Sequence, residues 1–483
     1  MTERIGRALP PPSGRPPVMN IAPRAVVGLD NELQTYQRMF TDCFVRREQR
    51  HWALKYSQGQ LLSLPRKSIE PMAVALAGGN IQAMQQFISQ GAWSDEEVLT
   101  IHRHAVAQTL GRPDGVLIFD GCEYPKQGRD SVGVARQYCG PLGKLANCQA
   151  SVVLAYASEV GATLVDRRLF VPQAWFDDAH RERWRKCGIP GTVRFQTKPA
   201  LAVAMFQAVV AEGVIPFEWV TMDEGYGAAG YLLDAIHQQN RRFFAEIPRS
   251  KQAWRRRPKV VPPEVHAPTG RPPTHAHLAP EAPPAQRVDA LARQLRVADW
   301  HRFIIQEGSK GPLEVEIAAL RVVLAEDGLP GREEWLVIRR PVGEADPKHW
   351  KFFRSNAPAE MPLTTLARLT AWRWPVESVI EECKDELGLD HYEVRGWVGW
   401  HHHTTMTLLA HHFLVRVRVK MGAQAPALTV SQVRRLLQVV LPQREFDAQE
   451  ALAELERIQR QNHAAYRSHR KRRRRAHKSP PPN

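Results

Sequence analysis

Cysteine is scarce in this sequence: there are six in 483 residues, and no two of them form the CxxC pairing typical of zinc sites. Secreted scaffolds that depend on disulfides have a denser framework of cysteines, so that class is excluded. Long apolar runs are also absent, because no stretch reaches the roughly 18 apolar residues that a membrane span requires. We therefore expect reduced, mostly buried thiols and a soluble cytoplasmic protein with no membrane contact.

Acidic residues are too few to balance the basic ones. Lys and Arg number 66 and Asp and Glu 50, which gives a net charge of 66 − 50 = +16. An excess of this size favours a polyanionic partner, and nucleic acid is the first candidate. The last residues, 467–483, contain eight basic and no acidic side chains, so the remaining body is also basic. We expect this tail to be a solvated, disordered arm.

Changes in composition along the chain predict its organisation. Apolar residues make up 43% of the sequence, which is enough for cores in roughly two to four units. The predicted order is a disordered Pro-rich leader over 1–30, a helical domain over 31–110, the first part of an α/β domain over 111–257, a Pro-rich linker over 258–285, a β-rich insertion over 286–358, the second part of the α/β domain over 359–420, a helical region over 421–466 and the basic tail over 467–483.

Two predicted strands lead into carboxylates. The apolar run over 116–119 is followed by Asp120, and the run over 214–222 is followed by Asp223. Continuous apolar runs of this kind are typical of strands buried on both faces. Further strands are expected over 148–157 and 162–171, with a helix over 198–212. Two acids placed at strand ends are the first sign of catalytic chemistry.

A third acid lies on a predicted helix through Trp374. Arg373, Glu377 and Lys384 are spaced by four and seven residues, which places them within a sector of roughly 60° on one helix face. Alone, this pattern is a common surface ladder of ion pairs. Together with two strand acids, however, it gives three carboxylates that are able to hold Mg²⁺ and two cations that are able to hold phosphate. Glu381, one turn beyond Glu377, is the alternative helix acid.

Five histidines lie on a helix predicted over 400–417: His401, His402, His403, His411 and His412. They lack acidic or cysteine partners at ligand spacing. We predict that they are hydrogen-bonded helix residues or phosphate contacts rather than metal ligands.

Three longer motifs carry a resemblance to a known family. They are FDGCEYPKQGRDSVGVARQYCGPLGKLANCQ over 119–149, MDEGYG over 222–227 and RWPVESVIEECKDELGLDHYEVRGW over 373–397. In content and order they resemble the catalytic blocks of bacterial insertion-sequence transposases of the DDE superfamily. The last motif is similar to the family's Y-x2-R-x3-E-x6-K signature, with Arg373, Glu377 and Lys384 in register. Two positions depart from the family pattern: Thr370 replaces the signature Tyr, and Cys122 replaces a Thr.

The resemblance implies a fold and an activity. The expected fold is α/β, an RNase H-like mixed sheet flanked by helices, with an N-terminal helical domain and a mostly β insertion before the last catalytic helix. The expected activity is Mg²⁺-dependent cleavage at transposon ends and strand transfer into target DNA. Asp120, Asp223 and Glu377 would be both the catalytic residues and the ligands of two Mg²⁺ ions, which Mn²⁺ can replace.

The expected partner is double-stranded DNA, both the terminal inverted repeats and the target, bound by a homodimer associated with the nucleoid. The expected DNA contacts are Arg373, Lys384, Lys126, Arg46, Arg47, Arg66 and Lys67. For the four N-terminal side chains a solvated surface is an equally good interpretation. Two other functions stay open: a metal-dependent nuclease of the same fold without strand transfer, and a domesticated DNA-binding protein without catalysis.

Overall fold

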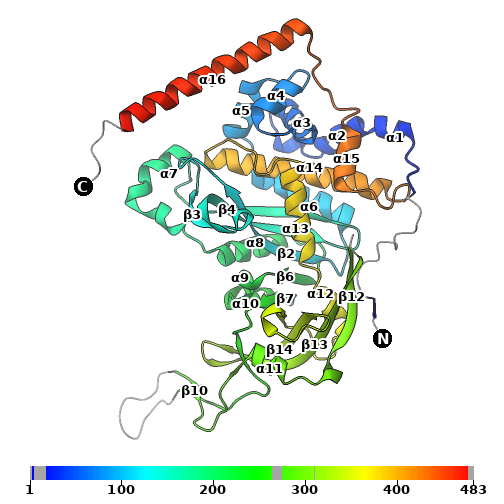
Figure 1. Cartoon of the computed structure of the whole chain (residues 1–483), viewed down its shortest axis with the longest axis vertical. Helices are drawn as coiled ribbons and strands as arrows, with labels where there is room; N and C mark the ends of the chain where they lie inside the picture. Colours follow the sequence, from blue (N-terminus) through cyan, green and yellow to red (C-terminus); the bar gives the residue numbers. More distant parts are fainter. Residues whose placement is uncertain (1–2, 5–17, 264–274, 309–310, 477–483) are drawn as a thin grey trace.

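The computed structural model describes residues 3–4, 18–263, 275–308 and 311–476 (Figure 1). Parts of the predicted leader, linker and basic tail therefore lie outside the described residues. No helix within the described ranges has the length and apolar character needed to span a bilayer. All six cysteines are free and buried, as predicted.

The central layer is a mixed sheet in which five strands follow the order β5-β4-β2-β6-β7. They are β2 (Val116–Pro125), β4 (Lys144–Ala157), β5 (Ala162–Phe170), β6 (Trp219–Met222) and β7 (Arg242–Ile247). β4 is antiparallel to both β2 and β5, whereas β6 and β7 run parallel to β2 after helical crossovers. The RNase H-like mixed sheet predicted from the sequence is thus confirmed.

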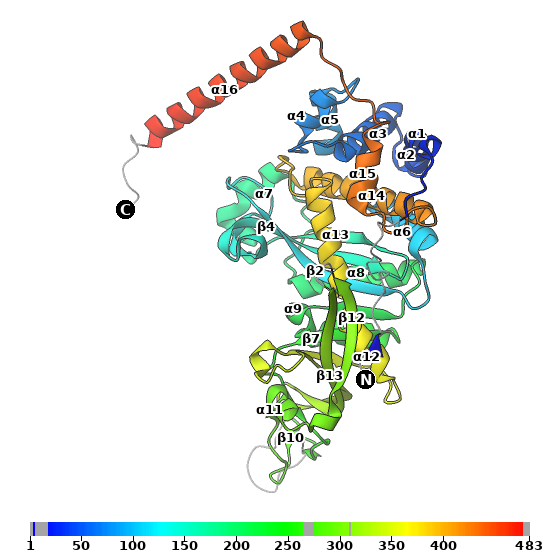
Figure 2. The ribbon, with the colours of Figure 1, turned by 45° about the vertical axis from the view of Figure 1, so that its right-hand side comes forward.

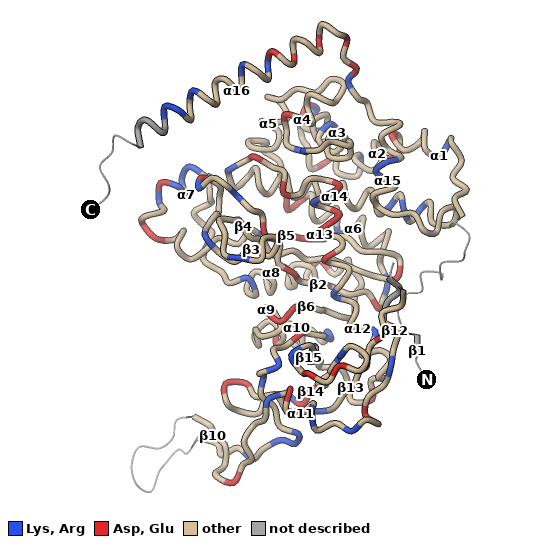
Figure 3. Tube along the Cα trace, viewed as in Figure 1, with Lys and Arg blue, Asp and Glu red and all other residues tan. Residues whose placement is uncertain are grey.

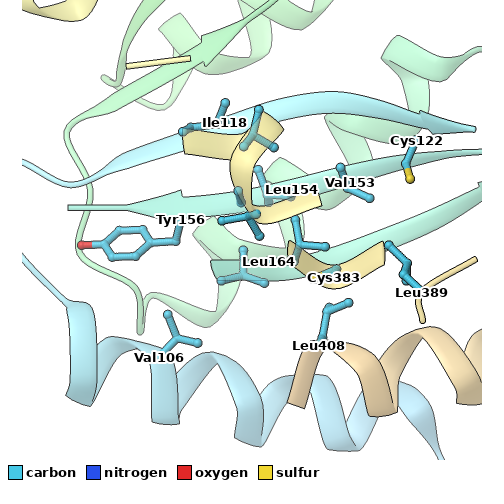
Figure 4. Packing of buried hydrophobic residues seen from close by; sticks show 14 of the residues in the cluster. Val106, Ile118, Cys122, Val153, Leu154, Tyr156, Leu164, Cys383, Leu389 and Leu408 are labelled. Carbon is cyan, nitrogen blue, oxygen red and sulfur yellow. The ribbon is translucent and has the colours of Figure 1, made fainter. Parts of the chain in front are cut away.

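Helices cover this sheet on both sides (Figure 1). Below it lies α8 (Lys198–Glu212), the predicted crossover helix, which packs on β4 and β5. Above it, three helices pack on β5: α6 (Asp95–Leu110), α13 (Trp374–Asp385) and α14 (Trp397–Met421). Figure 4 shows Val106 of α6 and Leu408 of α14 reaching the buried side chains of the sheet. The helix α13 is held firmly by this core, since Val376, Val379 and Cys383 are buried.

The β-rich insertion extends the same sheet. Its elements are β8 (Gln252–Trp254), β9 (Val260–Val261), β10 (His277–Leu278), β11 (Gln286–Arg287), α11 (Val288–Arg293), β12 (His301–Gly308), β13 (Gly311–Glu326), β14 (Leu329–Pro341) and β15 (Lys351–Ser355). β15 pairs antiparallel with β7, and the sheet continues through β14, β13 and β12 (Figure 2). The sequence predicts a β-rich insertion over 286–358 and does not predict that β15 pairs with β7. Without β15, the strand β7 would have an unpaired edge.

The N-terminal helices share one core with α14. They are α1 (Pro23–Val27), α2 (Leu29–Arg38), α3 (Arg47–Leu61), α4 (Ile69–Ala75) and α5 (Ile81–Ser89), followed by α6. Tyr36 and Tyr56 contact His412 and His403 through their hydroxyl groups, at 3.0 and 2.7 Å. The segment over 31–110 therefore packs as part of the body, around a helix from the other end of the chain.

Two terminal segments predicted to be disordered contain helix. The helix α1 lies within the predicted leader, and α16 (Ala448–Ala476) runs well into the predicted tail. The tail continues a helix already begun at Ala448, and Arg, Lys and Ala are good helix formers. Figures 1 and 2 show α16 projecting away from the body. Residues 477–483 of the tail lie outside the described residues.

Candidate active site

Asp120 and Asp223 are placed side by side by the register of two parallel strands. β2 pairs with β6 as far as Phe119 opposite Met222, so the two acids follow the last pair directly. Neighbouring strands lie about 4.8 Å apart. The sequence predicts that the strand ends at Asp120, and this prediction is wrong. β2 continues to Pro125 beside β4, and only its pairing with β6 ends at Phe119.

The two acids have different local supports. Asp120 is largely buried, with 15% of its side chain exposed, and its Oδ1 accepts the Gly121 backbone N–H at 2.7 Å. Asp223 is the N-cap of α9 (Glu224–Gly227), and its Oδ1 accepts the Tyr226 N–H at 3.1 Å. Capping orients the Asp223 carboxylate and leaves its second oxygen free of this bond.

The helix α13 brings Arg373 and Glu377 close to Asp120. The Arg373 guanidinium donates to Asp120 Oδ2 at 3.2 Å and also pairs with Glu377, which is 44% exposed. The face predicted for Arg373, Glu377 and Lys384 is thus the one that meets β2. Arg373 stands between a strand acid and the helix acid.

The pKa of Asp120 is affected by the two other acids of the site. Burial raises the pKa of Asp120 to about 7, against the opposing charge of Arg373, and the charges of Asp223 and Glu377 raise it further. A buried carboxylate that repels two others has a shortage of positive charge around it. A divalent cation would supply that charge.

The donor chemistry fits such a cation, because Mg²⁺ and Mn²⁺ prefer carboxylate oxygens. Among the described residues, however, no group of three or more His, Cys, Asp or Glu side chains is drawn together as a ligand set. Two of the three carboxylates are engaged by Arg373 instead. Cation binding therefore competes with the Arg373 guanidinium for the oxygens of Asp120 and Glu377.

A cavity of about 350 Å³ opens beside Asp120. Glu377, Glu381 and Lys384 line it from α13, and Pro141 lines it from the turn after β3 (Ala135–Cys139). Lys384 Nζ donates to the carbonyl of Glu123 at 3.3 Å. Both candidate helix acids face this cavity, but only Glu377 pairs with the arginine that also binds Asp120.

Glu123 is a site residue that the sequence reasoning missed. It lines the cavity three positions after Asp120, and Lys198 at the start of α8 pairs with it at 3.1 Å. The sequence motif could have indicated this residue, because Glu123 lies inside the motif over 119–149. Its pairing partner is far away in sequence and could not be assigned.

The predicted DNA contacts of the N-terminal helices differ in their surroundings. Arg46 and Arg47, at the start of α3, are exposed, and Arg66 pairs on the surface with Glu393 at 2.8 Å. Lys67 contradicts the prediction. It is 2% exposed, and its Nζ donates to the backbone carbonyls of Gln60 and Glu386, so it joins two parts of the fold rather than facing DNA.

Lys126 is half-buried and close to the protein core. Its Nζ lies 3.6 Å from the centre of the Tyr392 ring, and burial lowers its pKa to about 8. The two departures from the family signature are also buried. Thr370 donates to the Ala367 carbonyl at 2.7 Å, and Cys122 is 1% exposed beside Asp120. Both positions serve packing in this chain.

The histidines of α14 are buried and hydrogen-bonded, as one of the two predictions for them states. His403 faces the Tyr56 hydroxyl and two backbone carbonyls, and His411 lies between Thr163 and Glu382 at 2.9 Å from each. The contact of His411 with Glu382 connects α14 to α13. These rings hold the scaffold of the site together.

Comparison with known proteins gives two matches. A family model described as DDE superfamily endonuclease matches residues 39–312, more than half of the chain, and this range contains Asp120 and Asp223. A probable transposase for insertion sequence element IS701 from Microchaete diplosiphon is 29% identical over 204 residues. The alignment covers 42% of this chain and 48% of that relative, so the chain spans about half the length of the relative it matches.

Proposed function

Because the chain belongs to the DDE superfamily endonuclease family, we propose that it is a DNA transposase that cuts DNA at the ends of an insertion sequence and joins the freed ends to target DNA. One observation carries this proposal: Asp120 and Asp223 follow the last residue pair of two parallel strands, and α13 brings Glu377 to the arginine beside Asp120. The relative that is described as a probable transposase supports it.

Asp120, Asp223 and Glu377 are the proposed ligands of two Mg²⁺ ions, which Mn²⁺ can replace. When bound, such ions polarise the scissile phosphate and make water or a 3′-hydroxyl nucleophilic near neutral pH. The carboxylates hold and orient the cations. The raised pKa of Asp120 supports this role, since the protein alone leaves the negative charge there poorly compensated.

Arg373 and Lys384 are the proposed phosphate contacts of the catalytic helix. They lie on the helix face that meets β2, one on each side of Glu377. Water attacks the phosphorus, the bond from phosphorus to the 3′-oxygen breaks, and that oxygen leaves as a 3′-hydroxyl. The same hydroxyl then attacks a target phosphate and displaces another 3′-oxygen. Each element has two ends, and we propose that a homodimer binds them.

The test uses carboxylate variants of the full chain with DNA that contains the element's ends. Asp120→Asn, Asp223→Asn and Glu377→Gln should each lower Mg²⁺-dependent cleavage by at least about a hundredfold, because each removes a proposed metal ligand. DNA affinity should stay within about threefold, since the proposed phosphate contacts remain. Gel analysis of cleaved and joined products gives both readouts in one reaction.

The matched control is Glu381→Gln. This variant makes the same change of charge on the same helix, in the same cavity, and should cleave normally. If Glu381→Gln abolished cleavage and Glu377→Gln did not, the helix acid would be wrongly assigned. Cleavage that never yields joined DNA would identify a nuclease without strand transfer, and normal cleavage by all three ligand variants would refute the catalytic proposal.

A further inference from the structure

A second hollow lies beside the catalytic cavity, between the β3–β4 hairpin and the segment that ends in α7 (Arg181–Cys187). Its volume is about 570 Å³. The polar side chains that line it are Gln127, Arg129, Arg136, Asn147, His180 and Arg183, here called the arginine groove. Figure 3 shows basic positions gathered on α7 and the neighbouring strands.

The groove has a rigid floor. Trp175 is 1% exposed, and its indole N–H donates to the Val134 carbonyl at 3.0 Å, which fixes the ring. The Arg183 guanidinium lies 4.4 Å from the centre of this ring and also donates to the backbone carbonyl of Arg129. Asn147 donates to the carbonyls of Lys126 and Gly128, at 2.7 and 2.8 Å, and so holds the loop before β3.

The arginines of the groove have no ion-pair partner in the described part of the chain. They are Arg129, Arg136 and Arg183, and of these Arg129 and Arg136 are exposed to solvent. Two nearby acids have other partners: Asp130 pairs with Arg395 at 3.7 Å, and Glu182 pairs with Lys186 at 2.6 Å. Asp177 and Asp178, just before His180, are exposed. Two nitrogens on the groove wall, Arg183 Nε and His180 Nδ1, are buried and have no hydrogen-bond partner among the described residues.

One hairpin connects the arginine groove to the catalytic cavity. Arg136 on β3 lines the groove, and Pro141 in the turn after β3 lines the cavity that contains Asp120 and Glu377. β3 ends at Cys139 and Gly140–Leu142 form a 3₁₀ turn, so the five residues from Arg136 to Pro141 span at most about 16 Å. Along duplex DNA, this distance corresponds to about five base pairs.

We propose that the arginine groove binds the phosphate backbone of the DNA that is being cut, within about five base pairs of the scissile phosphate. This inference rests on the proposed function and adds a second anchoring point for the same substrate. Phosphate groups suit the site because three guanidinium groups without an ion-pair partner among the described residues bind polyanions without reading base sequence. The groove therefore sets the position of the duplex relative to Asp120.

The test measures binding of the full chain to a fluorescent duplex of mixed sequence, about 30 base pairs long, between about 50 and 200 mM salt. The variant is Arg129→Gln with Arg136→Gln, because both side chains are exposed and free of ion pairs. Loss of two phosphate contacts should reduce the slope of log affinity against log salt by about 1.8. The ratio of wild-type affinity to variant affinity should therefore be about tenfold smaller at about 200 mM salt than at about 50 mM salt.

The matched control is Arg249→Gln with Arg293→Gln, which removes the same charge from exposed positions beside α11 in the insertion. The control should keep the wild-type slope. An unchanged slope in the groove variant, or an equal decrease in both variants, would overturn the proposal. This test measures DNA binding and not cleavage. The same comparison can therefore be made with proteins that also carry Asp120→Asn and do not cleave. A failure of the groove proposal is thus distinguishable from a failure of the proposed catalysis.

The groove variant also separates the two DNA molecules of the reaction. If the groove holds the DNA that is cut, the variant should raise the KM for element ends, both in cleavage and in the joining of pre-cut ends, and leave the KM for target DNA unchanged. Loss of joining with normal cleavage would assign the groove to target DNA and would contradict the proposal.

Discussion

Acid should destabilise this protein through its buried histidines, and His403 allows the effect to be calculated. Its ring is 0% exposed. Nδ1 lies 2.7 Å from the Tyr56 hydroxyl, and Nε2 lies 3.1 and 3.2 Å from the carbonyls of Gly388 and Leu389. A neutral ring with its proton on Nε2 satisfies every one of these groups, since it donates to the carbonyls and accepts from Tyr56.

Burial lowers the pKa of His403 to about 3, whereas an unfolded histidine titrates near 6.5. The unfolded chain therefore binds the additional proton between these two values, and the free energy of unfolding falls as the pH falls below about 6.5. From about pH 7.5 to about pH 5.5, the loss from this one residue is about 1.4 kcal/mol.

The assay compares wild type with His403→Gln by urea unfolding at both pH values, followed by tryptophan fluorescence. All other titrating groups are present in both proteins, so their contributions to the pH dependence of the free energy of unfolding cancel. The wild type should lose about 1.4 kcal/mol more than the variant. His104→Gln is the control, because His104 lies exposed on α6, and it should show the wild-type dependence. Equal pH dependence in wild type and His403→Gln would refute a neutral buried ring.

Two further predictions concern DNA binding. Deletion of residues 467–483 should lower the affinity for element ends and for random duplexes by the same factor and flatten the salt dependence, because arginines and lysines bind phosphate without reading sequence; a filter-binding series over salt checks this, and loss of discrimination alone would contradict it. Arg46→Gln with Arg47→Gln should weaken the footprint on the element ends by about tenfold while random-duplex binding changes less, if the exposed start of α3 recognises the ends; an unchanged footprint would exclude that role.

The strands and acids of the site could be predicted because their signals are local. The run over 116–119 is continuously apolar, and its first four strand positions are fully buried between helices. The spacing of Arg373 and Glu377 likewise sets a helix face without reference to the rest of the chain. Their ion pair confirms that local reasoning.

What could not be predicted depends on partners that are distant in sequence. Lys67 is an ordinary charged residue by composition, but its ammonium group is buried because the Glu386 carbonyl, on the segment after α13, lies within reach. The register between β2 and β6 fixes where Asp120 lies, and no local pattern reports it. The insertion is another example, because the pairing of β15 with β7 joins strands separated by about a hundred residues of β-rich chain.

The position of α14 in the chain has a consequence for protein synthesis. The N-terminal helices leave the ribosome first, but the helix that completes their core is made only after the whole sheet and insertion. Until then the side chains of Tyr36, Tyr56 and Gln60 lack the hydrogen bonds that they form with α14. The nascent chain must therefore carry exposed apolar surface for most of its synthesis. In a chain that ended before α14, the N-terminal helices would lack the helix that completes their core.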